Sequence, residues 1–198
     1  DFCLSRGLGD VYKRQIVGSM CAVKSRVPTR SAILPVMAFR EPRSTPPARF
    51  DWVVRGRLAR SALPRSAGEI EWLHAQGMRR ILSFERIPRN GDAWVAIRRL
   101  RLEVYEVLVP DCEAPTFEQA EEILGLIRES LDSGTPLLFH CLAGVGRTGV
   151  AHGLYLMEFE GLEPEQAERR AGVETRHQAG FLAEWAAARR RRDNGGAP

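Results

Sequence analysis

Apolar positions from Phe50 onward fall into short runs that are typical of buried β-strands. The segment Trp52 to Leu58 predicts a strand or a short hairpin, and Ile81 to Phe84 predicts a buried strand. Two further strands are predicted over Leu102 to Val109 and over Pro136 to Phe139. Between these runs the apolar residues recur at helical spacing, so strands and helices alternate along the chain.

Two capping boxes mark the starts of predicted helices. Ser66-x-x-Glu69 opens a helix that Gly77 closes, and Thr116-x-x-Gln119 opens a second helix. The second helix has apolar residues at helical spacing, namely Phe117, Ala120, Ile123, Leu124, Ile127 and Leu131.

Glycines predict where the later helices end. Gly134 follows the second helix, and Gly161 follows an apolar helical segment over Val150 to Phe159. Pro164 fits the first turn of the next helix. The order of elements predicts a single α/β domain with a central, mostly parallel sheet flanked by helices. Its functional loop is expected at the C-terminal end of the last strand.

The first 49 residues are predicted to lie outside this domain. Residues 24–49 are rich in Pro, Ser, Thr and Arg, which predicts a linker or a disordered arm. Residues 1–15 resemble translated sequencing-adaptor sequence, and the biological start is then expected at Met20 or Met37. The folded domain is expected over residues 50–192, with a flexible tail over residues 193–198.

Composition allows one globular domain and argues against several classes of protein. Of the 198 residues, 44% are hydrophobic and 27% are charged, which suits one domain with a sizeable core plus tails. No apolar run reaches the roughly 18 residues of a membrane span, and Ile16 to Val23 is too short and polar for a signal peptide. The net charge of +4 fits phosphorylated or acidic substrates.

The stretch from His140 to Gly149 joins a predicted strand to a predicted helix through a glycine-rich turn. Such a turn directs several backbone N–H groups into one concavity, and the helix dipole adds positive potential there. An anion is therefore expected in this cradle. The residues expected to surround it with their backbone are Leu142, Ala143, Gly144, Val145 and Gly146.

Cys141 and Arg147 indicate that the anion is a phosphate to be cleaved. The field that attracts phosphate also favours the thiolate, and thiols in such places have pKa values of about 3.5 to 7.5 rather than about 8.5. Arg147 offers a planar fork that matches two phosphate oxygens, and Thr148 is placed to hydrogen-bond the departing sulfur. The predicted chemistry is attack of Cys141 on phosphorus, giving a phosphocysteine that water hydrolyses, with no metal or other cofactor. An inert loop and a phosphate-binding pseudoenzyme are the alternatives.

The motif His-Cys-x5-Arg-Thr-Gly resembles the signature of the cysteine-dependent protein tyrosine phosphatases. The resemblance extends roughly from Phe50 to Ala188 and is closest to the small, atypical dual-specificity branch. It implies a dual-specificity phosphatase-like fold and hydrolysis of phosphotyrosine and of phosphoserine or phosphothreonine. The enzyme alternative is a phosphatase of lipid, nucleotide or RNA 5′-phosphates, although lipid-directed members carry lysines where this loop has Leu142 and Val145. A phosphate-dependent binding module is the alternative from another class.

A general acid is needed to protonate the leaving oxygen, and Asp111 is the first choice. It follows the apolar run that ends at Val109, and the segment from Val109 to Thr116 is similar to the family's acid loop. Asp92 is the second choice and Glu113 the third. The alternative for Asp111 is a solvated turn residue without a catalytic role.

Several other polar residues carry weaker predictions. His140 is expected to hydrogen-bond within the loop and to hold the Cys141 backbone rather than to titrate. Residues 169–178 are shorter than the family's corresponding stretch and lack its proline, so Gln178 is predicted either to position water or only to begin the last helix. The run Arg189 to Arg192 predicts a solvated helix end, with anionic lipid or nucleic acid as the alternative.

The cysteines bear on where the protein acts. They occur at positions 3, 21, 112 and 141, form no spaced framework, and include a thiolate that requires a reducing compartment, so the cytoplasm is expected. Cys112 is predicted to form a protective disulfide with Cys141 on oxidation. We expect a monomer whose partner is a phosphorylated protein or peptide, without nucleic acid or a membrane span.

Overall fold

The central element of the fold is a mixed five-stranded sheet with the strand order β1-β2-β5-β3-β4. The computed structural model describes residues 44–193 and residue 195. Strand β1 pairs with β2 in an antiparallel hairpin, and β2, β5, β3 and β4 run parallel. The strands are β1 (Asp51–Val54), β2 (Leu58–Ala62), β3 (Arg80–Ser83), β4 (Glu103–Glu106) and β5 (Leu137–Cys141). The predicted mostly parallel sheet is thus confirmed.

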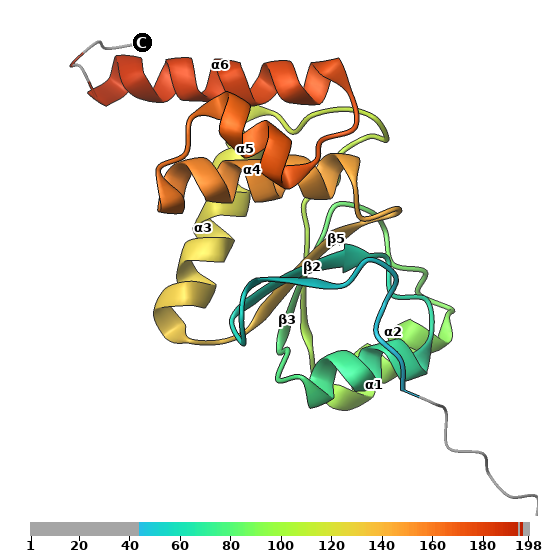
Figure 1. Cartoon of the computed structure of the whole chain (residues 1–198). Coiled ribbons are helices and arrows are strands. Elements are labelled where there is room, and N and C mark those ends of the chain that lie inside the picture. The colour runs from blue at the N-terminus through green and yellow to red at the C-terminus, as the bar shows by residue number, and fades with distance from the viewer. Residues whose placement is uncertain (1–43, 194, 196–198) are drawn as a thin grey trace, which may run out of the picture. The chain divides into compact units, whose positions relative to one another are not determined.

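Helices cover both faces of this sheet (Figure 1). The first two helices pack together on one face, and the next two cover the other face, while the last two pack against α4. The helices are α1 (Ala67–Ala75), α2 (Asp92–Leu100), α3 (Phe117–Ser133), α4 (Gly146–Glu160), α5 (Pro164–Ala171) and α6 (Arg176–Asp193). Within the described residues, no helix is long and apolar enough to cross a membrane.

Strand β5 lies at the centre of the sheet and is buried along its whole length. Its side chains alternate between two cores, as the period of a strand requires. Leu137, Phe139 and Cys141 belong to the core beneath α3 and α4, whereas Leu138 belongs to the core beneath α1 and α2. The nucleophile predicted from the sequence therefore ends the innermost strand on the α4 side.

Local capping signals agree with the structure. Ser66 Oγ accepts a hydrogen bond from Glu69 N at 3.2 Å, and Glu69 Oε2 accepts one from Ser66 N at 3.1 Å. The Thr116 and Gln119 pair forms the same reciprocal box at the start of α3. Gly77 is not the C-cap residue itself, because Gln76 holds that place and Gly77 follows it at a φ of +95°.

Several boundaries differ from the sequence prediction, and three of them shape the site. The hairpin continues through β2 to Ala62, because β2 pairs in register with β5 as far as Cys141. Strand β4 ends at Glu106 rather than Val109, although Val109 N still bonds to Phe84 O at 3.3 Å beyond the regular ladder. Helix α4 begins at Gly146 rather than Val150, so the last four residues of the predicted loop form the first helical turn.

The predicted N-terminal arm lies mostly outside the described residues, as do the adaptor-like residues 1–15 and Cys3 and Cys21. Its last part, residues 44–49, contains no helix or strand. It is nevertheless attached to the domain, because Ala62 N donates to Ala48 O at 2.8 Å. Of the predicted C-terminal tail, Asp193 ends α6, and residues 194 and 196–198 are not described.

Candidate active site

The candidate active site is the loop between β5 and α4. Cys141 is the last residue of β5, and α4 begins only five residues later at Gly146. The first N–H groups of a helix have no partner within the helix, and here they lie beside the amides of the preceding turn. Cys141 is 2% exposed, and its side chain lies beside these N–H groups.

Gly144 fixes how closely the loop lies on the sheet. Its φ is +74°, in the left-handed region that favours glycine. A Cβ at this position would lie 2.6 Å from Ala62 N and 2.7 Å from the carbonyl carbon of Ser61. The loop therefore rests directly on the end of β2, and only glycine satisfies both the backbone conformation and the contact.

The Cys141 thiol is surrounded by donors. Gly144 N donates to Cys141 Sγ at 3.2 Å. Burial raises the pKa of the thiol, but hydrogen bonding by the Thr148 side chain and by the backbone of Thr148, Gly144 and Val145 outweighs burial, so the pKa lies below its ordinary value. Thr148 Oγ1 completes no hydrogen bond of good geometry among the described residues, yet it lies near enough to stabilise the thiolate. The sulfur is thus prepared to act as an anion.

His140 lies fully buried behind the loop. Its Nδ1 is 3.3 Å from Cys141 O, which the ring can bond as a donor. Burial lowers the pKa of His140 to about 4, so the ring is neutral near pH 7. In register with it on the neighbouring strands are Ser61 and Ser83, both fully buried. These contacts place His140 where it can hold the Cys141 backbone, as expected from the sequence.

The guanidinium of Arg147 is buried and makes four hydrogen bonds. Nη1 donates to Val109 O at 2.9 Å, to Phe84 O at 3.3 Å and to Glu85 Oε2 at 3.0 Å. Nη2 donates to Asp111 Oδ1 at 2.8 Å. The arginine therefore links the catalytic loop to the ends of β3 and β4, and its planar fork is already held in place by the fold.

The three candidate acids are placed very differently. Asp111 contacts Arg147 and lines a cavity of about 310 Å³ together with it. Asp92 is the first residue of α2 and lines another cavity with Ala67 and Val95. The carboxylate of Glu113 pairs with His177 Nδ1 at 3.0 Å. Of the three, Asp111 is the one that the structure brings to the arginine of the loop.

Gln178 lies in the first turn of the last helix and also holds the segment that carries Asp111, so it does more than begin the helix, and its positioning of water stays a prediction. Its side chain is fully buried in the first turn of α6. Oε1 accepts from Glu174 N and Thr175 N at 3.1 and 3.2 Å, and Nε2 donates to Glu113 O at 3.1 Å. Thr175 Oγ1 adds a bond to Cys112 O at 3.3 Å. The shortened segment before α6 thus holds the loop that carries Asp111.

Two acidic residues of this site were missed in the sequence. Glu85 forms an ion pair with the buried Arg147, and Glu174 Oε2 lies 2.8 Å from where a Cβ on Gly146 would be. Glu85 directly follows the β3 segment, but nothing in its local pattern indicates a partner 62 residues away. Only the parallel pairing of β3 with β5 brings Glu85, which follows β3, close to Arg147, which follows β5.

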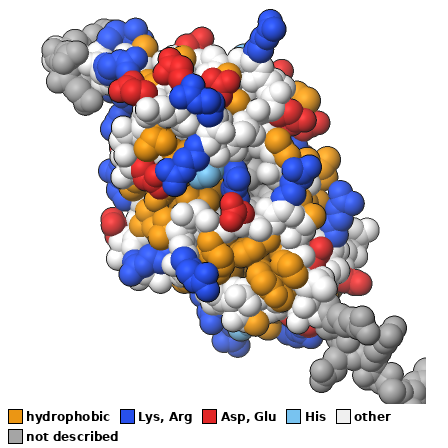
Figure 2. Space-filling model, viewed as in Figure 1, with side chains coloured by type: hydrophobic (Ala, Val, Ile, Leu, Met, Phe, Trp, Pro, Cys, Tyr) orange, Lys and Arg blue, Asp and Glu red, His pale blue; other side chains and the backbone are white. Residues whose placement is uncertain are grey.

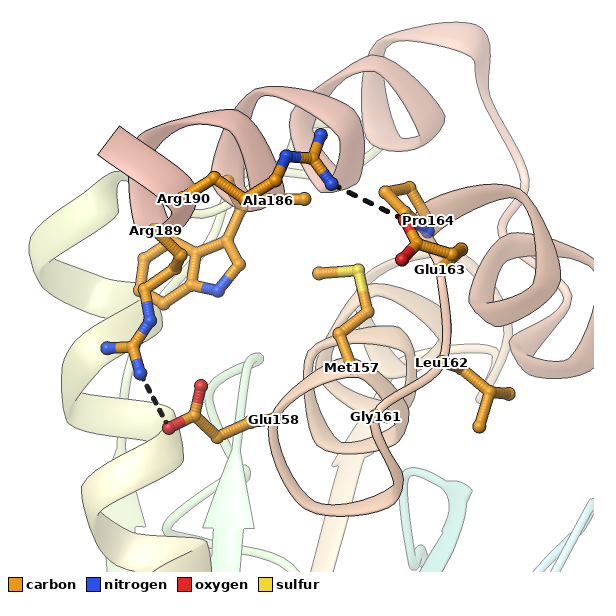
Figure 3. Close-up of a pocket in the computed structure, with 10 residues that line it drawn as sticks. Met157, Glu158, Gly161, Leu162, Glu163, Pro164, Ala186, Arg189 and Arg190 are labelled. Carbon is orange, nitrogen blue, oxygen red and sulfur yellow. Dashed lines mark hydrogen bonds and ion pairs between the residues drawn. The ribbon is translucent and has the colours of Figure 1, made fainter. Parts of the chain in front are cut away.

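The arginine run at the end of α6 is largely neutralised. Arg189 and Arg190 pair with Glu158 and Glu163 at 2.9 and 3.4 Å, on the two sides of a cavity of about 220 Å³ between α4, α5 and α6 (Figure 3). Arg192 pairs with Glu121 at 2.7 Å. On the face drawn in Figure 2, basic side chains are spread among acidic and apolar ones instead of forming one patch. These pairs agree with a solvated helix end.

Two further features of the described residues concern the second thiol, Cys112, and groups that could bind a metal ion. Cys112 is exposed at a φ of +63°, whereas Cys141 is buried, and both are free thiols. Their pairing on oxidation stays a prediction. In the part of the chain that is described, no group of three or more His, Cys, Asp or Glu side chains is arranged to hold a metal ion.

Comparisons with known proteins agree with this geometry. The family model described as "PTP-SAK: Swiss Army Knife protein, DSP-PTPase phosphatase domain" matches residues 47–193. A crystal structure of a mutant form of Tk-PTP is 29% identical, with a TM-score of 0.62 over 71% of this chain and 96% of that chain.

Two further solved structures share the fold at lower identity. Kinase associated phosphatase (KAP) is 19% identical, with a TM-score of 0.62 over 72% of this chain and 96% of that chain. The catalytic domain of the PP-IP phosphatase SIW14 from S. cerevisiae is 19% identical, with a TM-score of 0.60 over 78% of this chain and 97% of that chain. With the family match over most of its length, this chain belongs to the DSP-PTPase phosphatases, in the dual-specificity-like branch of the cysteine-dependent protein tyrosine phosphatase superfamily.

Proposed function

We propose that this phosphatase acts on proteins and hydrolyses phosphotyrosine together with phosphoserine and phosphothreonine. The observation that carries the proposal is that one loop brings together Cys141, whose pKa is lowered by its hydrogen-bond donors, the loop amides, and an Arg147 that contacts Asp111. These are the groups required to attack phosphorus, to bind its oxygens and to protonate the leaving group.

In the first step, the Cys141 thiolate attacks phosphorus and the bond from phosphorus to the leaving oxygen breaks. The loop amides and Arg147 stabilise the charge on the equatorial oxygens, and Asp111 gives its proton to the leaving oxygen. The products are a phosphocysteine and the dephosphorylated side chain. Thr148 stabilises the sulfur by the same contact that lowers the pKa of the thiol.

In the second step, water attacks phosphorus and the bond from phosphorus to sulfur breaks. The Asp111 carboxylate accepts a proton from this water, inorganic phosphate leaves, and the Cys141 thiolate is restored. Gln178 already uses Oε1 for two backbone N–H groups and Nε2 for Glu113 O. This arrangement favours support of the acid loop over direct positioning of water.

The loop supports a protein substrate over an inositol lipid. Its side chains include the apolar Leu142 and Val145 and no lysine, so beyond Arg147 it offers no cation for a second phosphate. Leu142 is 42% exposed beside the cradle, where it suits contact with a peptide. We further propose that the protein acts in the cytoplasm, because a catalytic thiolate requires a reducing compartment.

The test is a substrate panel. Phosphotyrosine, phosphoserine and phosphothreonine peptides are compared with soluble inositol phosphates, a nucleotide monophosphate and a 5′-phosphorylated RNA, with Cys141→Ser as the inactive control. We expect the highest kcat/KM with the phosphopeptides and loss of all turnover in Cys141→Ser. Faster turnover of any non-protein class would overturn it.

A further inference from the structure

A second cavity opens beside the catalytic loop, on the side of α1 and α2. Its volume is about 220 Å³. Three segments line it: the turn after β2 with Leu63, Pro64 and Arg65, the segment that leads into α2 with Pro88, Gly91 and Ala93, and Leu142 of the loop. Arg65 is the one lining residue with a charged or polar side chain. The cavity is therefore an apolar site with a single cation at its edge.

This cavity is continuous with the catalytic loop. Leu142 directly follows Cys141, and its partly exposed side chain forms one wall. Leu63 N donates to Leu142 O at 3.3 Å. This bond ties the turn after β2, which forms the opposite wall of the cavity, to Leu142. The residue that follows the predicted nucleophile in the chain therefore forms part of the cavity wall.

A single segment separates this cavity from the one beside the acid. Residues 84–86 line the cavity that contains Arg147 and Asp111, whereas Pro88 and Gly91 line the apolar cavity. Arg147 links the first cavity to the phosphate loop and Leu142 links the second, so the two cavities lie at different parts of the same loop. Two neighbouring residues of a bound peptide could place their side chains in the two cavities, because successive side chains of an extended peptide point in different directions.

Size and lining indicate what the cavity binds. An apolar cavity of about 150 Å³ is large enough to hold benzene, so the observed volume accepts one leucine or phenylalanine side chain. A nucleobase would leave its polar edges without partners against proline, glycine and leucine. Arg65 is exposed and forms no ion pair among the described residues, so its charge favours an anionic peptide at the entrance.

We propose that this cavity is a specificity subsite that binds one large apolar side chain next to the phosphorylated residue of a protein substrate. The inference rests on the proposed protein phosphatase function and narrows its substrates to sequences with such a neighbour. The gain in affinity comes from removing the apolar side chain from water.

The test uses phosphotyrosine peptides whose other residues near the phosphate are alanine. A single leucine is placed directly before or directly after the phosphotyrosine. One of the two placements should raise kcat/KM about tenfold, as expected for burial of a leucine side chain. The same peptide should bind the inactive Cys141→Ser variant about tenfold more tightly, measured by fluorescence anisotropy.

Filling the cavity should remove this preference. Gly91 has an extended backbone, with φ −90° and ψ 157°, which any residue adopts, so Gly91→Leu adds a side chain without backbone strain. We expect the leucine peptide to fall to the level of the alanine peptide, with turnover of a small aryl phosphate unchanged. Ala93→Leu fills the same cavity from α2 and provides a second variant if the first does not fold.

Gly125→Leu is the matched control. Gly125 lies exposed on α3, and a Cβ there would meet no atom within 4 Å. This variant should keep the preference for leucine. Loss of the preference in Gly125→Leu as well, or its persistence in both filled variants, would overturn the assignment of the subsite.

The peptide results separate the subsite from the proposed function. Hydrolysis of the alanine peptide with no gain from either leucine would reject the subsite and leave the protein phosphatase function standing. If no phosphopeptide is hydrolysed and alkyl phosphates improve with chain length, the cavity binds an acyl chain, and both proposals are wrong.

Discussion

Arg147 and Asp111 form a direct ion pair, with 2.8 Å between Nη2 and Oδ1, although the arginine side chain is 3% exposed and the aspartate 73%. The buried cation is fixed by backbone carbonyls, whereas the carboxylate lies largely in solvent. One guanidinium therefore joins the phosphate loop to the segment that carries Asp111, and its binding of a phosphate stays a prediction. Effects of changing the two residues are expected to be strongly non-additive.

The role of Asp111 as acid predicts a defect that depends on the leaving group. Asp111→Asn should slow formation of the phosphocysteine by ~10² to 10⁴ with a phosphotyrosine or phosphoserine peptide. The loss should be much smaller with an aryl phosphate whose phenol is strongly acidic, because that oxygen needs little protonation. Pre-steady-state rates across a series of phenols measure this gradient. The same gradient in Asp92→Asn, with none in Asp111→Asn, would transfer the role to Asp92.

The geometry of the Arg147 fork predicts that charge alone is insufficient. A lysine keeps the charge but cannot donate at once to Val109 O, Phe84 O and two carboxylates. Arg147→Lys should lower kcat/KM for an aryl phosphate by about 10² or more, as expected when several charge-assisted bonds are lost. Arg55→Lys, in the exposed β1–β2 turn, is the control and should be neutral. Near wild-type activity in Arg147→Lys would assign phosphate binding to the backbone amides.

The lowered pKa of Cys141 predicts alkylation at a lower pH than an ordinary thiol requires. The thiolate is populated above the folded-state pKa, so the rate of reaction with iodoacetate should rise at a pH below the ordinary thiol range near 8.5. Phosphate or vanadate should protect the thiol. Thr148→Val removes a stabilising group and should move the midpoint to higher pH. Peptide mapping in a Cys112→Ser background identifies the alkylated residue, and a rise only above about pH 8 would contradict the prediction.

The contacts of Gln178 predict which chemical step it affects. Gln178→Ala removes the bond to Glu113 O and should loosen the acid loop, so formation of the phosphocysteine should slow most for poor leaving groups. The effect should appear mainly in kcat, because the Gln178 side chain makes its hydrogen bonds to Glu174, Thr175 and Glu113 and none to the phosphate loop. Gln76→Ala, at the end of α1, is the control. A burst of product followed by slow turnover would instead mean that Gln178 positions the water of the second step.

The close approach at Gly144 predicts a steric as well as a conformational penalty. Gly56 has a nearly identical φ of +73°, but no atom lies within 4 Å of a Cβ added there. Gly56→Ala should therefore lower the free energy of unfolding by about 1–2 kcal/mol, the strain of the left-handed conformation alone. Gly144→Ala should lower it further and abolish activity. Denaturant unfolding of both variants measures the difference, and equal losses would refute the role of the contact.

Sequence reasoning succeeded where a signal and its structural effect are close together in the chain. The boxes at Ser66 and Thr116 and the helix-ending Gly134 and Gly161 act within one helical turn, so their patterns are sufficient. The same holds for the phosphate loop, whose amides and thiol come from ten consecutive residues of the sequence.

Contacts between distant segments were not accessible in this way. The link from Arg147 to Glu85 and the hold of Gln178 on the acid loop depend on strand order and helix packing. Helix α2 lacks such a local signal, since it is nine residues long and its N-cap, Gly91, provides no side-chain cap. The early start of α4 was missed, because glycines at 146 and 149 read as loop when their packing against Gln178 and Gly172 is unknown.

The register of β5 has a consequence for how the enzyme can fail. Cys141 is aligned with Ala62 of β2, and His140 is aligned with Ser83 of β3. The pairing with two neighbouring strands therefore sets the position of the thiol along the sheet and the face of the sheet on which it lies. A slip of one residue in a strand reverses every side chain, and here it would turn the sulfur toward α1 and away from its donors. Molecules with a misaligned β5 would keep most of their secondary structure but would lose phosphatase activity. The active fraction of a preparation would therefore fall with the fraction of molecules in which β5 is paired in the wrong register.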